Sequence, residues 1–363
     1  MHILYDGLIY SGQKAGGISR YFQNLISRLP QDVVPNLLTA GEPNFNFPKH
    51  SQLKNYSYQK FRPGRISNQV QKLYFEYAFY RANPNLIHPT YYQTLLKKDL
   101  QKICIPIVVT VHDMIHEIKN ELAQPNFLEV IEQKKKAIFR ADAIICVSEN
   151  TKKDLLELYS LPEEKVKVTH LATNLNIDMS YGQESVPEIP YYLYVGSRSK
   201  YKNFQCLLYA FAKVVSSHTE VKLCVVGDPF RDDEKQLISE LNITNHVIHY
   251  SFLSDNYLAK LYRCSIALVY PSLYEGFGIP PLEAMACGTV AIASNCSSIP
   301  EVVGDAGFLF DPESTLELAD IMESLIDSPI NRNHLIAKGK KQTELFNWNK
   351  TAAQTLEVYR SLM

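Results

Sequence analysis

The sequence contains no uninterrupted run of about 18 apolar residues, which is the minimum that an ordinary transmembrane helix requires. Its first residues, Met1 to Gly7, have neither the basic n-region nor the apolar h-region of a secretory signal. The seven cysteines are far apart, odd in number and mostly inside apolar runs, which excludes a disulfide framework and a zinc motif. These absences predict a cytoplasmic protein with reduced thiols.

A strong charge of one sign is also missing. The 37 Lys and Arg residues nearly balance the 38 Asp and Glu residues, so the net charge is −1, which argues against a nucleic-acid partner. The balance is uneven along the chain. Residues 1–180 hold 22 basic and 17 acidic residues, whereas the remainder holds 15 basic and 21 acidic residues.

No acidic residue occurs from Pro43 to Phe75, where basic and aromatic residues are interleaved. The basic residues are Lys49, Lys54, Lys60, Arg62, Arg65 and Lys72, and the aromatic ones are Phe45, Phe47, Tyr56, Tyr58, Phe61, Tyr74 and Phe75. One interpretation is a surface for anionic lipid head groups or an anionic glycan carrier, with peripheral contact at the inner face of a membrane. The other is a solvated loop followed by an ordinary amphipathic helix.

At 363 residues the chain is long enough for two domains, and 46% hydrophobic residues are sufficient for packed cores. Short β-branched apolar runs alternate with segments of helical period, which is typical of parallel α/β layers. In the first half we expect strands at His2–Tyr5, Leu86–His88, Ile105–Val111 and Ala143–Val147. The helices expected between them are Ile18–Leu29, Asn68–Arg81, Phe127–Arg140 and Asn150–Tyr159, the last capped near Ser148.

The polar stretch Ile177–Pro190 contains glycine and proline, a composition that is typical of a linker. The expected domains are therefore residues 1–180 and 181–345, with a terminal segment 346–363. After the linker we expect strands at Tyr191–Val195, Val221–Val226, Val247–Tyr250, Ile266–Tyr270 and Val290–Ala293, and a helix at Asn203–Val215. Two α/β domains joined in this way form a cleft, and α/β sheets bind ligands at the carboxyl ends of their strands.

The stretch Ile266 to Gly288 carries the most chemical information. A strand is followed by a turn with Gly276 and Gly278, which let the backbone approach a ligand closely, and then by a helix that begins with two prolines. A helix N-terminus beside such a turn is an anion site, so a phosphate is expected there. Glu275 precedes the turn and Glu283 lies inside the expected helix, eight positions on, and each carboxylate can accept two sugar hydroxyls.

This segment closely resembles the Glu-x7-Glu motif of the family 4 retaining glycosyltransferases, which have the GT-B fold. The likeness includes the preceding strand, the Gly-Phe-Gly turn, the proline and the small-residue helix. The resemblance implies two Rossmann-like α/β/α domains and a C-terminal helix, Trp348 to Leu362, that crosses back to the N-terminal domain. It implies that Glu275 contacts the donor sugar and that Glu283 binds the nucleotide ribose. Backbone amides around Gly276, Phe277, Gly278 and Ile279 would contact the sugar or the phosphates.

Other stretches resemble the family where its ligand-contacting loops occur. The loop Gly196 to Asn203 matches the family's basic loop, in which Lys202 and Arg198 would neutralise the donor diphosphate in place of a metal, although Ser197 stands where the family often has arginine. The glycines Gly16 and Gly17 match its N-terminal loop, and His112 would contact the donor sugar. Phe252 and Leu253 follow a strand where the family packs the nucleotide base.

Three other classes of protein were compared with this interpretation. A nicotinamide oxidoreductase is excluded because Pro281 stands where its third glycine should be. A nucleotide-sugar epimerase of the same fold remains open, and so does a non-enzymatic glycan-binding protein, although the latter gives no reason for Lys202, Glu275 and Glu283 to share a phosphate–sugar site. Because no Asp-x-Asp pair occurs, neither a metal nor another cofactor is expected.

The expected reaction is transfer of a hexose from a nucleoside diphosphate sugar to a glycan or lipid-linked acceptor, with retention of configuration. The expected catalytic residues are Glu275, His112, Lys202 and Arg198. No residue stands out as a covalent nucleophile, so the resemblance implies a front-face displacement in which the leaving diphosphate assists deprotonation of the acceptor. Likeness to the family favours GDP-mannose as donor.

Overall fold

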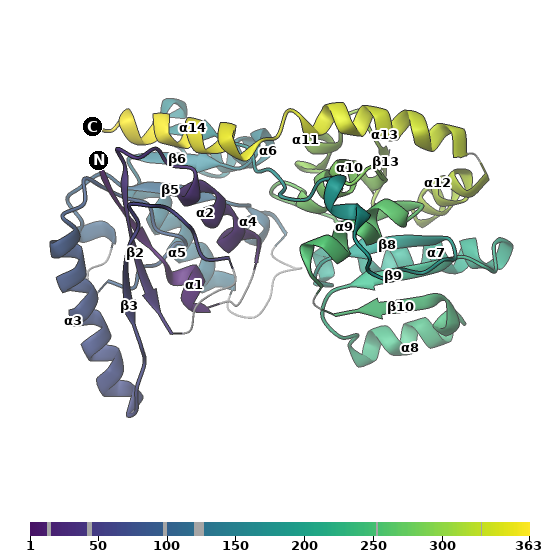
Figure 1. The fold of residues 1–363 in the computed structure, drawn as a ribbon, viewed down its shortest axis with the longest axis horizontal. Helices are drawn as coiled ribbons and strands as arrows, with labels where there is room; N and C mark the ends of the chain where they lie inside the picture. The colour runs from purple at the N-terminus through teal and green to yellow at the C-terminus, as the bar shows by residue number, and fades with distance from the viewer. Residues whose placement is uncertain (13–15, 42–45, 97–99, 120–126, 252, 328) are drawn as a thin grey trace. The chain divides into compact units, whose positions relative to one another are not determined.

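The computed structural model describes residues 1–12, 16–41, 46–96, 100–119, 127–251, 253–327 and 329–363. They form two compact units (Figure 1). Unit 1 comprises Met1–Leu171 and Trp348–Met363, and unit 2 comprises Ala172–Asn347. Each unit has a parallel sheet covered by helices, which confirms the predicted α/β class. The domain limits expected from the sequence, at 180/181 and 345/346, lie near these borders and stay a prediction.

The sheet of unit 1 is parallel throughout its described strands. Two ladders, in the orders β3-β2-β1-β4 and β5-β6-β7, are joined by a bridge between Ile87 and Ile107. The bounds are β1 (His2–Asp6), β2 (Val34–Ala40), β3 (Lys54–Tyr58), β4 (Leu86–Ile87), β5 (Val108–Val111), β6 (Ala143–Cys146) and β7 (Val166–Val168). Because β1 lies between β2 and β4, the chain reverses its winding direction there, as in Rossmann-like sheets.

Helices cover both faces of this sheet because successive strand residues point to opposite sides. Leu4 belongs to a core shared with residues of α3, α5 and α6, such as Phe75, Ile138 and Leu155. On the other face, Tyr5 contacts Phe22 of α2. The helices are α1 (Leu8–Gly12), α2 (Gly17–Ser27), α3 (Gly64–Ala82), α4 (Ile115–Ile118), α5 (Phe127–Arg140), α6 (Glu149–Leu158) and α14 (Trp348–Arg360). The predicted cap is confirmed, because the Ser148 side chain accepts a hydrogen bond from the N–H of Thr151.

The last helix, α14, returns to unit 1 and packs against α2, as the resemblance implied (Figure 1). Its buried Tyr359 hydroxyl lies 2.6 Å from Nδ1 of His88 and 3.2 Å from the hydroxyl of Tyr5. The other ring nitrogen of His88 lies 2.8 Å from the Thr110 hydroxyl. Burial lowers the pKa of His88 to about 3, so this imidazole is neutral and acts as a core hydrogen-bonding group.

Unit 2 has a six-stranded parallel sheet in the order β10-β9-β8-β11-β12-β13. The strands are β8 (Tyr191–Val195), β9 (Lys222–Val226), β10 (Val247–Tyr250), β11 (Ala267–Tyr270), β12 (Val290–Ser294) and β13 (Phe308–Phe310). The winding direction reverses between β8 and β11. In an open α/β sheet this reversal opens a crevice at the carboxyl ends of the two strands, where ligands bind.

The strands of unit 2 are apolar on both faces because helices cover both. Tyr192 and Tyr194 of β8 pack into a core with α7 and α12, whereas Tyr191 and Leu193 pack into a second core with α9 and α10. The helices are α7 (Phe204–Ser217), α8 (Asp232–Glu240), α9 (Asp255–Cys264), α10 (Ile279–Ala286), α11 (Ile299–Val303), α12 (Thr315–Asp327) and α13 (Pro329–Thr343).

Several segments differ from the sequence-based expectations. The expected strands did not include β2, β3, β7 or β13, and β3 lies within the stretch Pro43–Phe75, for which one interpretation was a loop before a helix. Pro43 to Phe45 lie outside the described residues.

The expected linker Ile177–Pro190 is held against α9, because Tyr257 donates to the carbonyl of Ser185 and Lys260 to that of Gly182. Among the described residues, no helix is both long and apolar enough to cross a membrane.

Candidate functional site

The turn between β11 and α10 is held in shape by two serines that follow β12. The Ser298 hydroxyl donates to the carbonyls of Glu275 and Phe277, at 2.9 and 2.8 Å, and the N–H of Glu275 donates to the Ser297 hydroxyl at 2.9 Å. Gly278 caps α10 with φ +112°, a conformation that favours glycine. A rigid turn of this kind presents the N-terminus of α10 and the Glu275 side chain at the carboxyl edge of the sheet.

Lys202 and Glu275 meet at the reversal point of the unit 2 sheet. Lys202 follows β8, Glu275 follows β11, and these two strands are neighbours. The Lys202 ammonium donates to Oε1 of Glu275 at 2.6 Å, and the two side chains are only 14% and 12% exposed. The sequence placed both residues in the site, and the structure brings them into direct contact.

Tyr270, the last residue of β11, completes this pair and was not predicted from the sequence. Lys202 Nζ lies 3.3 Å from the Tyr270 hydroxyl and 5.4 Å from the centre of its ring. Burial raises the pKa of Tyr270 well above its usual value, and the charge of Glu275 and a hydrogen bond to it raise the pKa further. Tyr270 therefore stays neutral and offers a fixed hydroxyl to both the ammonium and the carboxylate. The sequence feature that could have indicated Tyr270 is its position at the end of the strand that precedes the motif at Glu275.

Glu283 lies inside α10 and is buried. The Tyr262 hydroxyl of α9 donates to its Oε2 at 2.9 Å. This contact orients the carboxylate from the neighbouring helix of the same layer, since α9 and α10 both cover the face of the sheet that holds Tyr191. Sequence reasoning selected Glu283 but gave no indication of Tyr262.

Arg198 is buried and engaged in several contacts. Its Nε donates to Glu234 at 3.0 Å, its Nη2 donates to the carbonyls of Asp228 and Pro229, and its guanidinium lies 4.9 Å from the Phe230 ring centre. Its Nη1 is buried and has no hydrogen-bond partner among the described residues. The structure thus gives Arg198 a packing role at the ends of β8 and β9, with only its Nη1 nitrogen not engaged among the described residues.

The backbone at the ends of β8 and β9 approaches closely. Gly227 has φ +156°, and a Cβ there would lie 2.5 Å from the carbonyl oxygen of Gly196. Gly196 has φ +136°, and a Cβ there would meet no atom within 4 Å. At this edge of the sheet the space next to Gly196 is therefore not filled by other atoms of the protein. Leu253 is partly buried against the core that contains Tyr262, and the predicted Phe252 lies outside the described residues.

The predicted residues of unit 1 lie around the start of α2 and the end of β5. Gly16 caps α2 in an extended conformation that any residue adopts, and Gly17 begins the helix. The His112 ring lies edge-on to Tyr21, with its centre 5.5 Å away, and its Nε2 has no hydrogen-bond partner in the part of the chain that the structure describes. Burial lowers the pKa of His112 to about 4, and the Lys134 charge lowers it further against the opposing effect of Asp113.

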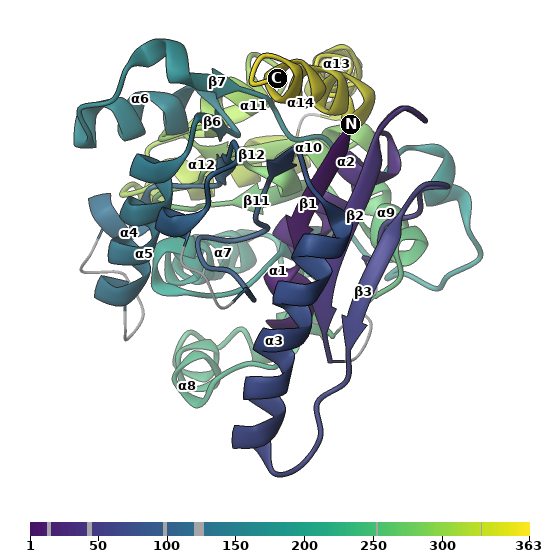
Figure 2. The same ribbon diagram turned by 90° about the vertical axis from the view of Figure 1, so that its left-hand side faces the viewer.

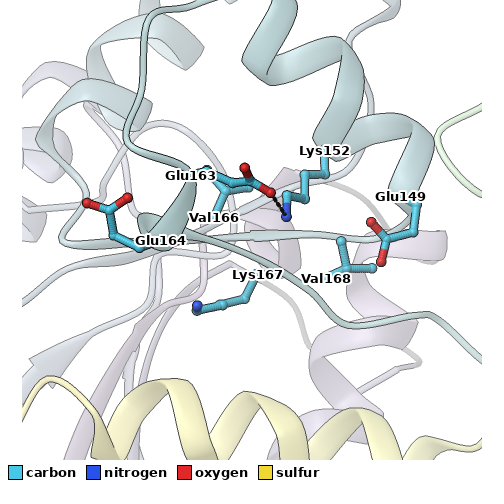
Figure 3. A pocket seen from close by; sticks show the side chains of 7 residues that line it. All are labelled: Glu149, Lys152, Glu163, Glu164, Val166, Lys167 and Val168. Atoms are coloured by element: carbon cyan, nitrogen blue, oxygen red, sulfur yellow. Dashed lines mark hydrogen bonds and ion pairs between the residues drawn. The ribbon is translucent and has the colours of Figure 1, made fainter.

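A surface hollow of unit 1 is lined by none of the predicted site residues (Figure 3). Lys152 and Glu163 pair across it at 2.9 Å, while Glu164 points away. It is lined by Glu149, Lys152, Glu163, Glu164, Val166, Lys167 and Val168. None of these residues was predicted, and the central charges already neutralise each other, so this hollow is not the candidate site. Within the described ranges, no three His, Cys, Asp or Glu residues cluster so as to hold a metal ion.

Two protein-family models match the chain. Glycosyltransferase Family 4 matches residues 15–176, and Glycosyl transferases group 1 matches residues 182–342. The chain is 31% identical over 235 residues to the O-antigen chain mannosyltransferase B of Escherichia coli, covering 61% of this chain and 61% of that protein. It is 28% identical to the MMP alpha-(1->4)-mannosyltransferase of Mycolicibacterium hassiacum, covering 98% of this chain and 90% of that protein.

The chain thus spans less than two thirds of the first of these relatives. Its fold is similar to that of the sucrose-phosphate synthase of Thermosynechococcus elongatus, with a TM-score of 0.79, 23% identity, and coverage of 100% of this chain and 99% of that one. These findings confirm the resemblance drawn from the motif at Glu275, and none of them supports the epimerase or the glycan-binding alternative. The chain therefore belongs to the glycosyl transferases of group 1 and family 4, with the GT-B fold.

Proposed function

We propose that the protein is a retaining hexosyltransferase that moves mannose from a nucleoside diphosphate sugar, GDP-mannose by preference, to a glycan or lipid-linked acceptor in surface polysaccharide or glycoconjugate synthesis. The observation that carries this proposal is the Lys202–Glu275 pair at the reversal point of the unit 2 sheet. Support for mannose comes from the names of the two relatives, both of which are mannosyltransferases.

Lys202 and the N-terminus of α10 suit the donor diphosphate. The ammonium offers a positive charge in a site that is largely shielded from water, where charge interactions are stronger. Gly276 to Ile279 bring backbone N–H groups to the same place. Arg198 adds a smaller contribution, through Nη1 alone, because its other nitrogens are engaged.

Glu275 accepts hydrogen bonds from hydroxyls of the transferred sugar, next to the bond that breaks. Glu283, oriented by Tyr262, accepts from the ribose hydroxyls. Gly16, Gly17 and His112 contribute from unit 1, with His112 neutral at pH 7 because of its lowered pKa. Gly196 and Leu253 border the nucleotide.

The reaction is a front-face displacement. The bond between the anomeric carbon and the diphosphate oxygen breaks while the acceptor oxygen attacks the anomeric carbon from the same face. The acceptor proton moves to the departing phosphate oxygen, so the products are the glycosylated acceptor and the nucleoside diphosphate. Lys202 stabilises the negative charge that develops on the leaving group, and no metal takes part.

The test is a donor screen that measures released nucleotide and transferred sugar together. GDP-mannose with an acceptor should release GDP and extend the acceptor, and Lys202→Ala should lower that rate on the order of 100-fold. Formation of an epimerised nucleotide sugar without release of GDP would contradict the proposal. Excess EDTA should leave the rate within about twofold, and a complete loss that added metal restores would overturn the metal-free mechanism.

The protein is further proposed to work in peripheral contact with an anionic membrane. The support is the distribution of charge, since residues 1–180 carry five more basic than acidic residues (22 against 17) while the rest of the chain carries six more acidic than basic ones (21 against 15). Lipid-linked acceptors are presented at such a surface, where basic residues gain about 1 kcal/mol each.

A further inference from the structure

Helix α3 (Gly64–Ala82) has apolar residues on two opposite faces. Ser67, Phe75, Ala78 and Ala82 are buried against the sheet of unit 1. The residues Ile66, Val70, Leu73, Tyr77 and Tyr80 are exposed by 52, 40, 62, 62 and 65%. Their spacing of four, three, four and three residues places them on one stripe of a helix. An ordinary amphipathic helix would carry polar residues there, so this exposed stripe needs another explanation.

Basic residues surround the exposed stripe. Arg65 and Lys72 lie along one of its sides and Arg81 along the other, at about 100° of rotation per residue. Lys54, Lys60 and Arg62 precede the helix, and all six side chains are exposed. Glu76 is the one acidic residue from Lys49 to Arg81. In both views the first turns of α3 project beyond the sheet of unit 1 (Figures 1 and 2).

We propose that the exposed stripe of α3 docks unit 1 onto an anionic lipid bilayer, with the helix axis in the plane of the membrane. Ile66, Val70 and Leu73 would enter the boundary between head groups and acyl chains, and Tyr77 and Tyr80 would lie at head-group level. The surrounding Arg and Lys side chains would bind the phosphates. This inference rests on the membrane contact included in the proposed function and is independent of the donor site in unit 2.

Charge favours lipid over a second copy of the chain. A helix pair formed through this stripe would bring two sets of Arg65, Lys72 and Arg81 together with a single acidic residue from each copy, and like charges repel at such distances. An anionic bilayer neutralises the same residues. The buried face of α3 fixes the helix to the sheet, so docking needs no refolding of the helix.

The test is flotation of the whole protein with vesicles of phosphatidylcholine, with and without phosphatidylglycerol. Binding should require phosphatidylglycerol and weaken with salt, because the Debye length falls from about 10 Å at 0.1 M to about 3 Å at 1 M. The double variant Leu73→Gln/Tyr77→Gln should reduce partitioning at least about tenfold. Arg65→Gln/Lys72→Gln should reduce it by about fivefold for each charge removed.

The matched control is Leu316→Gln/Tyr209→Gln in unit 2, whose side chains are 63% and 43% exposed. It should float like the wild type. Equal flotation with both kinds of vesicle, or with neither, would overturn the proposal. So would a dimer of the wild type, seen in sedimentation without vesicles, that Leu73→Gln/Tyr77→Gln converts to a monomer. GDP binding measured on the same samples by calorimetry reports on the donor site, so a failure there counts against the proposed function and not against docking.

Discussion

Lys202 and Glu275 neutralise each other at 2.6 Å. In the function that we propose, the donor diphosphate would therefore compete with Glu275 for the same ammonium. As the phosphate takes over the positive charge, the carboxylate becomes available to the hydroxyls of the sugar. Tyr270 holds the ammonium during this exchange through its buried hydroxyl. At the scale of single residues, the site therefore consists of two opposite charges and one neutral hydroxyl.

Substitutions at the two glutamates should have different consequences. Glu275→Gln removes a charge that the proposed function places close to the reacting bond, so it should lower kcat on the order of 100-fold. The affinity for GDP should stay equal or rise, because Lys202 is released from the ion pair. Glu283→Ala removes the proposed contact with the ribose, which does not change during the reaction, so it should raise the donor KM and weaken GDP binding with a smaller effect on kcat. Calorimetry with GDP and steady-state kinetics measure both. If Glu275→Gln alone lost GDP binding, the two roles would be reversed.

Tyr270→Phe should lower kcat about tenfold or more, because hydrogen bonds to charged groups contribute about 1.5–3 kcal/mol. GDP affinity should stay within about threefold, since Lys202 keeps its charge. Tyr191→Phe is the matched control, because it removes another buried hydroxyl of the same core, bonded to the carbonyl of Leu261, at the start of β8 rather than at the carboxyl end of a strand. Equal kcat values for the two variants would show that Tyr270 only packs.

At the scale of helices and strands, the position of α14 depends on a few buried polar contacts. The Tyr359 hydroxyl reaches both His88 and Tyr5, and the Thr351 hydroxyl donates to the carbonyl of His170. Trp348 packs near Tyr21 of α2, with ring centres 6.3 Å apart. A helix that ends the chain is thus a structural part of the unit that begins it.

Tyr359→Phe should lower the free energy of unfolding by about 1–3 kcal/mol, because Nδ1 of the buried His88 loses its partner. Denaturant unfolding followed by circular dichroism measures the change. His88→Leu/Tyr359→Phe removes both polar groups and should cost less than the sum of the two single substitutions. If the loss in the free energy of unfolding for the double variant equalled the sum of the two single losses, the two side chains would not interact.

The strands near the sequence motifs could be predicted because both faces of those strands are covered, which gives continuous apolar runs. Strand β3 could not be predicted, because Lys54, Asn55 and Ser57 are exposed and its sequence pattern is that of a polar loop. Lys202 and Glu275 were recognised from their motifs, but their contact depends on β8 and β11 being neighbours, which sequence order does not state. Arg198 was predicted from its charge. The phenyl rings and carbonyls around it could not be predicted, because they come from other parts of the sequence.

For the molecule as a whole, pH should act on stability through buried groups. Asp6 ends β1 and is fully buried, and it accepts a hydrogen bond from the N–H of Leu95 at 2.6 Å. Burial raises its pKa to about 7, against 3.8 for an exposed carboxyl. The folded protein therefore holds this proton where the unfolded chain has released it, and the contribution of Asp6 to stability falls as the pH rises from about 4 to 7.

Asp6→Asn should become more stable relative to the wild type as the pH rises, by roughly 4 kcal/mol between pH 4 and pH 8. Asparagine keeps an acceptor for Leu95 and does not titrate. The comparison is of unfolding free energies for the two proteins across that range, so that other titrating groups, such as His88 and His112, cancel. A difference that does not change with pH would show that Asp6 is ionised in the folded protein.

Unit 1 is built from two separate stretches of chain, and this has a consequence for biosynthesis. A ribosome adds about 5–20 residues per second, and domains fold as their last residues emerge. Residues 172–347 are all present before α14 exists, so the second unit can fold while the first still lacks its final helix. Until Tyr359 emerges, the apolar surface around Tyr21, Phe22 and His88 stays uncovered, and this surface is what a chaperone would meet on the nascent chain.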